Sequence, residues 1–102
     1  MILKNNDAVT VAPHLHTVVE ENEKVRILRV NVKPGDSAQM HTHPDSVFVI
    51  LQGGVLDMTN TDGVTKSVEC KTGTSWFAPA TEHSVVNNGD TEVKIILIEL
   101  LN

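Results

Sequence analysis

Two histidines separated by one residue, His41 and His43, are the most informative chemical feature of the sequence, and a third, His83, follows much later. In a β-strand, successive side chains point to opposite faces, so His41 and His43 project to the same side, about 7 Å apart along the chain. Neutral imidazole is the commonest metal ligand in proteins, and three convergent histidines make half of a coordination shell. The pattern predicts a metal ion held inside a small β-barrel.

A second pair with the same spacing, His14 and His16, follows Pro13 near the start of the sequence. Segments close to a terminus are often poorly anchored, so we expect neither residue to be a metal ligand; at most they would line the mouth of the barrel. The single cysteine, Cys70, is expected to be a small buried residue. The sequence contains no Gly-x-Ser-x-Gly, phosphate-loop or Cys-x-x-Cys motif, which argues against hydrolase, nucleotide-binding and thiol-redox functions.

The length and composition predict one domain that spans residues 1–102, because 102 residues with 40% hydrophobic content can bury a substantial core. A net charge of −5 and only 3% aromatic residues argue against a nucleic-acid partner, which requires basic groups for phosphates and aromatic rings for bases. The longest apolar run, residues 95–98, is far too short to span a bilayer, and the first residues do not resemble a signal peptide. With a single cysteine as well, we expect a cytoplasmic protein without membrane association.

Turn-forming residues recur at short intervals and separate segments rich in Val, Ile and Leu, which is typical of an all-β domain. We expect about nine or ten short strands and little helix, with strands near residues 14–20, 24–33, 38–43, 47–52, 55–60, 64–68, 75–78, 82–87 and 92–101. The strands at 47–52 and 92–101 are apolar on both faces. A single barrel covers only one face of a strand, so we predict a homodimer that covers the other.

Two sequence motifs frame the histidines, and together they resemble those of the cupin family. The first motif has a glycine, five residues and then His-x-His, and the second has a glycine, five residues, a proline, a histidine and an asparagine. The matching residues are Gly35, His41, His43 and Gly53 in the first motif, and Gly73, Pro79, His83 and Asn87 in the second. The resemblance covers residues 25–101 and is strongest to the small single-domain bacterial cupins of the conserved-barrel type. It implies a double-stranded β-helix, or jelly-roll, barrel with a metal bound by His41, His43 and His83.

The sequence departs from the family pattern at one metal ligand. Counting back from Gly53, the position of the family's glutamate is occupied by Ser46, which is a poor ligand. Asp45 is adjacent and would reach inward through a local bulge, and Gln39, on the same strand face as the histidines, is the other nearby oxygen donor. The resemblance therefore implies a three-histidine centre for one divalent transition metal (Fe, Ni, Zn or Mn).

The remaining site residues are expected to be apolar. We expect Phe48 and Ile50 to fill the barrel interior below the metal, and Trp76 to line the pocket or pack against it. Two classes of function stay open. One is a small-molecule metalloenzyme, dioxygenase-like or isomerase-like, in which the metal keeps open positions for a substrate. The other is a non-catalytic module that binds a small ligand or metal, as a sensor does; a purely structural role is a weaker third alternative.

Overall fold

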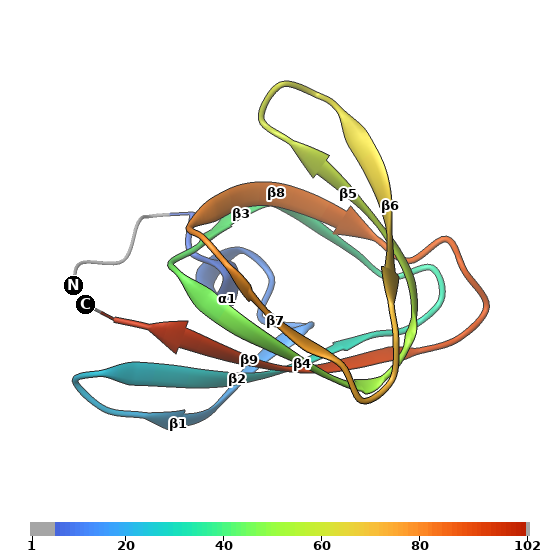
Figure 1. The fold of residues 1–102 in the computed structure, drawn as a ribbon. Helices are drawn as coiled ribbons and strands as arrows, with labels where there is room; N and C mark the ends of the chain where they lie inside the picture. Colours follow the sequence, from blue (N-terminus) through green and yellow to red (C-terminus); the bar gives the residue numbers. More distant parts are fainter. Residues whose placement is uncertain (1–5, 102) are drawn as a thin grey trace.

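Nine antiparallel strands form two sheets that face each other in the computed structural model, which describes residues 6–101 (Figure 1). The five-stranded sheet has the order β1-β2-β9-β4-β7 and the four-stranded sheet the order β3-β8-β5-β6. The elements are α1 (Ala8–Val11), β1 (His16–Glu21), β2 (Val25–Val32), β3 (Ser37–His43), β4 (Ser46–Gln52), β5 (Gly54–Asn60), β6 (Thr65–Cys70), β7 (Ser75–Ala78), β8 (Thr81–Val86) and β9 (Val93–Leu100). The prediction of an all-β barrel with almost no helix is confirmed.

The core lies between the two sheets, because alternate residues of each strand point inward. In β9 the residues from Val93 to Leu97 alternate between buried and half-buried positions, and the same alternation occurs in β2 and β4. The buried side chains that meet in the centre include Leu28, Ile50 and Leu97 from the larger sheet and Leu56 and Val85 from the smaller one. Because side chains alternate between the two faces of a strand, His41 and His43, two residues apart in β3, both point inward.

Two of the motif glycines occupy turns that require a left-handed backbone. Gly35 has φ of 88° and Gly73 has φ of 84°, a region that L-amino acids with a side chain rarely adopt. The motif asparagine, Asn87, is buried, and its side-chain nitrogen donates hydrogen bonds to the carbonyl oxygens of Val32 (2.8 Å) and Thr91 (2.9 Å). These residues thus fix the loops at one end of the barrel.

The segment before β1 packs against the barrel near the histidines. Asp7 caps α1 by accepting a hydrogen bond from the backbone nitrogen of Val9, and Ala8 and Ala12 are fully buried. Asp7 also forms an isolated bridge with Thr42 of β3. β1 then begins at His16. The position of His16 is defined by the anchored segment before it and by its pairing with Val30 of β2. Among residues 6–101, no helix is long and apolar enough to cross a membrane.

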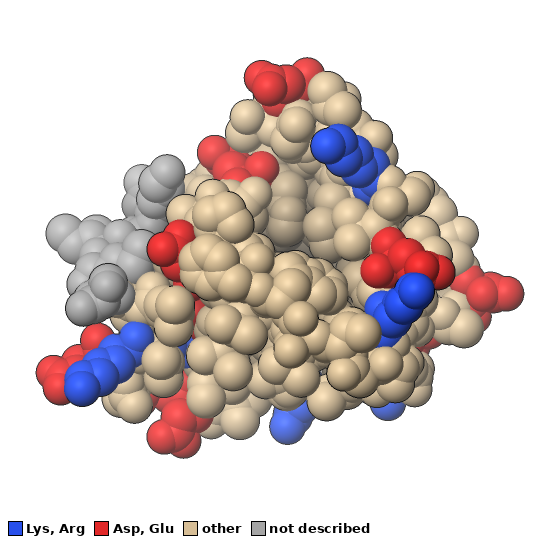
Figure 2. All heavy atoms as spheres, in the orientation of Figure 1, with Lys and Arg blue, Asp and Glu red and all other residues tan. Residues whose placement is uncertain are grey.

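The outward face of the five-stranded sheet carries an apolar surface over β4, β7 and β9, and the exposed Arg29 of β2, opposite Ile96, borders this surface. Val47 of β4 lies directly opposite Ile98 of β9 and Phe77 of β7, and Val49 lies opposite Ile96. Phe77 is 57% exposed, which is high for so large an apolar side chain. Figure 2 shows that the surface over β4 and β7 is largely uncharged, with acidic and basic side chains towards its edges.

Candidate metal centre

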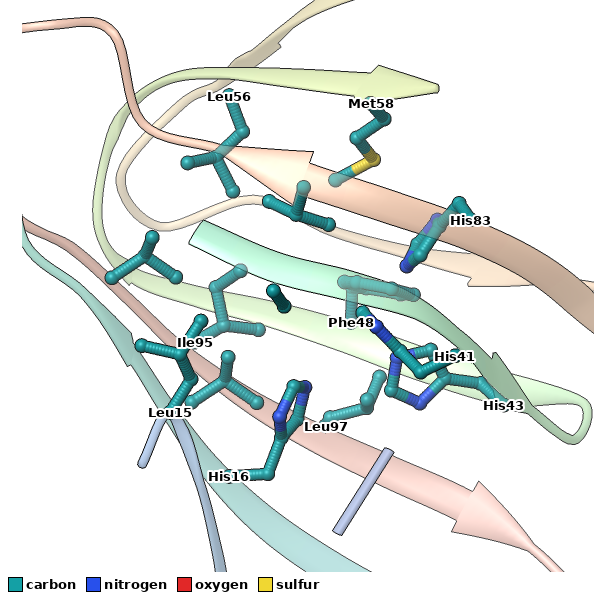
Figure 3. A pocket seen from close by; sticks show the side chains of 14 residues that line it. Leu15, His16, His41, His43, Phe48, Leu56, Met58, His83, Ile95 and Leu97 are labelled. Carbon is teal, nitrogen blue, oxygen red and sulfur yellow. The ribbon is translucent and has the colours of Figure 1, made fainter. Parts of the chain in front are cut away.

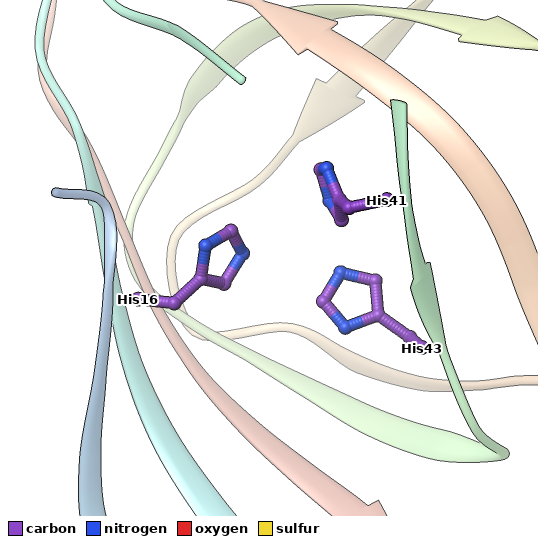
Figure 4. Close-up of side chains that lie close together, drawn as sticks. All are labelled: His16, His41 and His43. Atoms are coloured by element: carbon purple, nitrogen blue, oxygen red, sulfur yellow. The ribbon is translucent and has the colours of Figure 1, made fainter. Parts of the chain in front are cut away.

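Three histidine side chains converge inside the barrel from two different strands (Figure 4). His16 comes from β1, and His41 and His43 come from β3. Their candidate ligand nitrogens all lie within 4.8 Å of one another, and all three side chains are buried. Two nitrogens that bind the same ion at about 2.0–2.1 Å lie at most about 4.2 Å apart. Small side-chain movements from the present arrangement would therefore allow all three nitrogens to bind one metal ion.

A β-bulge in β3 determines which side chains of this strand face the cluster. Ala38 pairs with Val85, but His41, three residues later, pairs with His83, only two residues away in β8. One extra residue in β3 therefore keeps both Ala38 and His41 on the inward face, which an unbroken alternation would not allow. The bulge also turns the backbone carbonyl of Gln39 towards His41.

Each of the three histidines is oriented by a hydrogen bond from Nδ1. The acceptor is the Ala12 carbonyl for His16 (3.0 Å), the Gln39 carbonyl for His41 (2.7 Å) and the Glu99 carboxylate for His43 (2.8 Å). Oxygen atoms of carbonyls and carboxylates accept, so the proton of each neutral ring is on Nδ1 and the lone pair is on Nε2.

The Nε2 atom of His41 tests whether the donor set fits a metal. It is a buried side-chain nitrogen without a hydrogen-bond partner among the described residues. A buried polar atom without a partner is unfavourable by about 1–3 kcal/mol, so such an atom requires an explanation. A metal ion bound to Nε2 provides one, and the donor set therefore fits a metal.

His83 borders the same cluster from β8. Its ring centroid lies 4.9 Å from that of His41, its cross-strand partner, and 5.4 Å from that of His43. The side chain is buried, like the other three. The structure thus brings together the three histidines of the two motifs and adds His16 as a fourth.

All four imidazoles are neutral at physiological pH. Burial, reinforced by the neighbouring histidines, lowers the pKa of His43 and His83 from 6.5 to about 3. Burial also lowers the pKa of His16 to about 4 and shifts that of His41 in the same direction. A neutral imidazole is the form that binds a metal, so no proton has to leave at pH 7.

A buried network of charged groups lies beside His43. Glu99 is fully buried; its Oε2 atom accepts from His43 and its Oε1 atom accepts from Nε of Arg26 (2.6 Å). The same guanidinium donates two further hydrogen bonds to Asp7, at 3.0 and 2.8 Å. Burial raises the pKa of Glu99, and the guanidinium opposes this shift.

A cavity of about 30 Å³ adjoins the histidines (Figure 3). The four histidines form one side of its wall, and the rest is apolar. The apolar lining residues are Leu15, Val30, Val32, Ala38, Phe48, Leu56, Met58, Val85, Ile95 and Leu97. A space of this size holds about two water molecules, so in this conformation the cavity admits only a small ligand.

None of the three oxygen donors considered from the sequence lines this cavity. The side chain of Gln39, expected on the histidine face, is exposed because of the bulge, and only its carbonyl acts at the site. Asp45 is also exposed and accepts a hydrogen bond from the backbone nitrogen of Ala80 (2.8 Å). Ser46 is buried on the inward face, but its hydroxyl donates to the carbonyl oxygen of Pro44 (2.7 Å).

The expected apolar residues are found in different places. Phe48 lines the cavity, whereas Ile50 is buried in the core outside the cavity wall. Trp76 packs against the core and stacks on Phe48 with ring centroids 5.2 Å apart, so it supports the wall from behind.

The structure places His16 differently from what was expected for the pair His14 and His16. His16 belongs to the buried cluster, while His14 is exposed and its Nε2 atom bonds the carbonyl of Ser37 (2.9 Å). The His-x-His spacing of His14 and His16 is visible in the sequence, but the sequence does not show how firmly the segment before β1 is anchored to the barrel. Glu99 was missed as well, because nothing in the local sequence distinguishes it from a solvent-exposed residue at the end of a strand.

Comparison with known proteins supports the fold and the motifs. A family model described as "Cupin domain" matches residues 28–99. A solved structure of a cupin domain from Bordetella pertussis Tohama I is 31% identical, with a TM-score of 0.78, and the match covers 84% of this chain and 91% of that one. The chain belongs to the cupin family, and its barrel is the predicted double-stranded β-helix.

More distant structures share the fold alone. An uncharacterized conserved protein with a double-stranded β-helix domain from Klebsiella pneumoniae is 18% identical, with a TM-score of 0.67 and coverage of 84% of this chain and 75% of that one. The polyketide cyclase RemF from Streptomyces resistomycificus is also 18% identical, with a TM-score of 0.63 and coverage of 85% and 64%. A comparison with curated proteins finds no match.

Proposed function

We propose that this protein binds one divalent transition metal through His16, His41 and His43, with His83 as a fourth nitrogen donor. The observation that carries the proposal is the orientation of the first three rings: each Nδ1 is held by an oxygen acceptor, and the ligand nitrogens converge. The unpartnered Nε2 of His41 lies in this cluster. Imidazole nitrogen favours Zn²⁺, Ni²⁺, Cu²⁺ and Fe²⁺ over the harder Mn²⁺, which prefers carboxylate oxygen.

Metal analysis of protein purified without an affinity tag tests this proposal. Wild-type protein and the His14→Ala variant should each bind close to one metal ion per chain. The His41→Ala/His43→Ala double variant should bind none, and His16→Ala should bind metal more weakly. The proposal fails if the double variant retains the wild-type metal content. If His16→Ala binds like His14→Ala, the ligands are instead the three motif histidines His41, His43 and His83.

We propose further that the metal acts on a small molecule. The cavity beside the histidines supports this, because its other walls are apolar and provide space for the uncharged part of a ligand. When bound, the metal would supply Lewis-acid chemistry, and the apolar walls would exclude water from it. No carboxylate lines the cavity, so the lining side chains that could accept a proton are the histidines themselves.

Activity assays distinguish an enzyme from a binding module. Iron-loaded protein is tested for dioxygen uptake with small thiols and catechols, and Zn- or Ni-loaded protein for isomerisation of small carbonyl compounds. Turnover that disappears in the His41→Ala/His43→Ala variant would establish a metalloenzyme. The small volume of the cavity, about 30 Å³, favours the alternative of a non-catalytic metal-binding or sensor module. That alternative predicts tight metal binding without turnover of any of these compounds.

We also propose a homodimer formed by the apolar outward face of the five-stranded sheet. The apolar part of this face lies over β4, β7 and β9, and its best complement is a second copy of the same surface. It consists of Val47, Val49, Ile96, Ile98 and Phe77 and is bordered by Arg29 of β2. Phe77→Glu should convert a dimer to a monomer in light scattering at tens of micromolar. Val64→Glu, at a similarly exposed position outside this face, is the matched control. A monomeric wild-type protein would refute the proposal.

We propose a cytoplasmic location on the basis of the single free cysteine, Cys70, which is buried and unpaired by any disulfide in the described residues. Fractionation of cells that express the native protein tests this, with recovery in the membrane or secreted fraction as the contrary result.

A further inference from the structure

We infer that Glu99 is the positioning carboxylate of this metal centre and that it acts through His43, not as a metal ligand. The inference rests on the proposed metal binding and specifies how one ligand is held. Glu99 has no exposed surface, and both of its oxygen atoms are already engaged. Oε2 accepts from Nδ1 of His43 at 2.8 Å, and Oε1 accepts from Arg26 at 2.6 Å.

The position of Glu99 in the sheet explains how the carboxylate comes to lie there. Glu99 of β9 is the direct cross-strand partner of Ser46 of β4, and both residues are buried on the inward face. The hydroxyl of Ser46 is bound to the Pro44 carbonyl, so Ser46 supplies no ligand. The small side chain of Ser46 leaves room beside it, and the neighbouring strand β9 provides a carboxylate there, that of Glu99.

The three oriented histidines are not equivalent. His16 and His41 donate from Nδ1 to backbone carbonyls, which are neutral, whereas His43 donates to a carboxylate. A hydrogen bond to an ionised acceptor is stronger and increases the electron density on the imidazole. His43 is therefore the strongest donor of the cluster, and its ring is held so that Nε2 remains free for the metal.

Arg26 and Asp7 hold the Glu99 carboxylate in place, and together the three side chains determine the net charge of the network. Asp7 accepts two hydrogen bonds from the Arg26 guanidinium, and Arg26 bonds Glu99 on its other side. Two carboxylates and one guanidinium carry a net charge of −1 beside a site that has only neutral ligands. This buried negative charge favours occupation of the site by a cation. Asp7 also caps the helix that leads to His16, so the network connects two of the proposed ligands.

The test compares zinc affinity in Glu99→Gln and Val93→Ala by competition with a chromogenic chelator. Glu99→Gln keeps the side-chain shape but removes the charge, and loss of such a partner weakens metal binding about 10–100-fold. Val93→Ala shortens a fully buried side chain in the same strand, β9, that does not line the cavity. Val93→Ala should therefore lower stability in denaturant unfolding but leave zinc affinity close to that of the wild type. The visible spectrum of bound Co²⁺ should change in Glu99→Gln and stay unchanged in Val93→Ala.

A measurement on the wild-type protein decides the question if Glu99→Gln does not fold. Histidine-selective ¹⁵N NMR of the zinc-loaded protein should show His43 protonated at Nδ1 and bound to zinc through Nε2. Zinc bound to Nδ1 of His43, or equal zinc affinity in Glu99→Gln and wild type, would overturn the inferred role of Glu99 but leave the proposed metal binding standing. Absence of zinc binding by the wild-type protein would overturn the proposed function and this inference together.

Discussion

Acidification of the metal-free protein should destabilise it strongly, because four buried histidines must remain neutral for the barrel to fold. In the unfolded chain a histidine has a pKa near 6.5, whereas in the barrel the pKa is about 4 for His16 and about 3 for His43 and His83. A lowered folded-state pKa means that the unfolded state binds more protons below pH 6.5. Stability is therefore complete above pH 6.5 and is lost as the pH falls towards the folded-state values.

The size of the effect follows from the same pKa values. Each of these three histidines should contribute a loss of about 1.6 kcal/mol between pH 6.5 and about pH 5, or about 5 kcal/mol in total. The raised pKa of Glu99 works in the opposite direction, so this sum is an upper value. A small domain has a total stability of about 5–15 kcal/mol, so the metal-free protein should approach unfolding near pH 5.

Denaturant unfolding in the presence of a chelator, followed by the fluorescence of Trp76, measures this loss across the pH range. The His16→Leu variant should lose about 1.6 kcal/mol less than the wild type over the same interval. His14→Gln, which removes an exposed imidazole two residues away, should show the wild-type loss. Saturating Zn²⁺ should raise stability most at neutral pH, where protons do not compete. A total loss below about 1 kcal/mol, or equal losses in wild type and His16→Leu, would refute the reasoning.

Three further changes test the packing of the barrel. Ser46→Glu should destabilise the protein by more than about 2 kcal/mol in denaturant unfolding, because it adds a second buried carboxylate beside Glu99. The double variant Ser46→Glu/Glu99→Gln should recover part of this stability and prefer Mn²⁺ more than the wild type does in a competition titration. An unchanged metal preference would contradict our placement of Ser46. Gly53→Ala should lower stability by about 1–3 kcal/mol, since a Cβ atom would lie 2.2 Å from the Cys70 carbonyl oxygen; an unchanged melting temperature would show that the two loops separate easily. Leu56→Ala should lower stability by about 2–5 kcal/mol and enlarge the cavity, and a smaller loss would mean that the wall collapses around the deletion.

Local sequence patterns predicted the barrel well because the strands are defined by local chemistry. Alternating apolar residues, together with glycines at turns such as Gly35 and Gly73, mark where strands begin and end. The nine expected strand segments correspond to the nine strands of the structure. The spacing of His41 and His43 correctly placed both side chains on one face, although the bulge before them changes the face of Gln39. A bulge depends on the pairing with β8, which a single strand does not encode.

The parts of the site that escaped prediction depend on contacts between distant segments. Glu99 reads as the polar end of an apolar strand, and its partner Arg26 lies in β2, far away in the sequence. His16 reads as a residue near a terminus, yet the segment before it is anchored through Asp7 and two fully buried alanines. The proposed roles of Glu99 and His16 depend on tertiary packing, not on spacing or composition.

The proposed site therefore combines two parts of the chain with different origins. The matched cupin domain, residues 28–99, contains His41, His43, His83 and Glu99. His16, Asp7 and Arg26 lie before it, and their contacts hold the first segment against the barrel. Because a ligand that binds only the folded arrangement stabilises it, metal binding to His16 would also stabilise the docking of this segment. In the proposed site, the absence of a carboxylate at Ser46 would be compensated from two sides. An imidazole from β1 would add a donor, and Glu99 would supply negative charge without occupying a position on the metal.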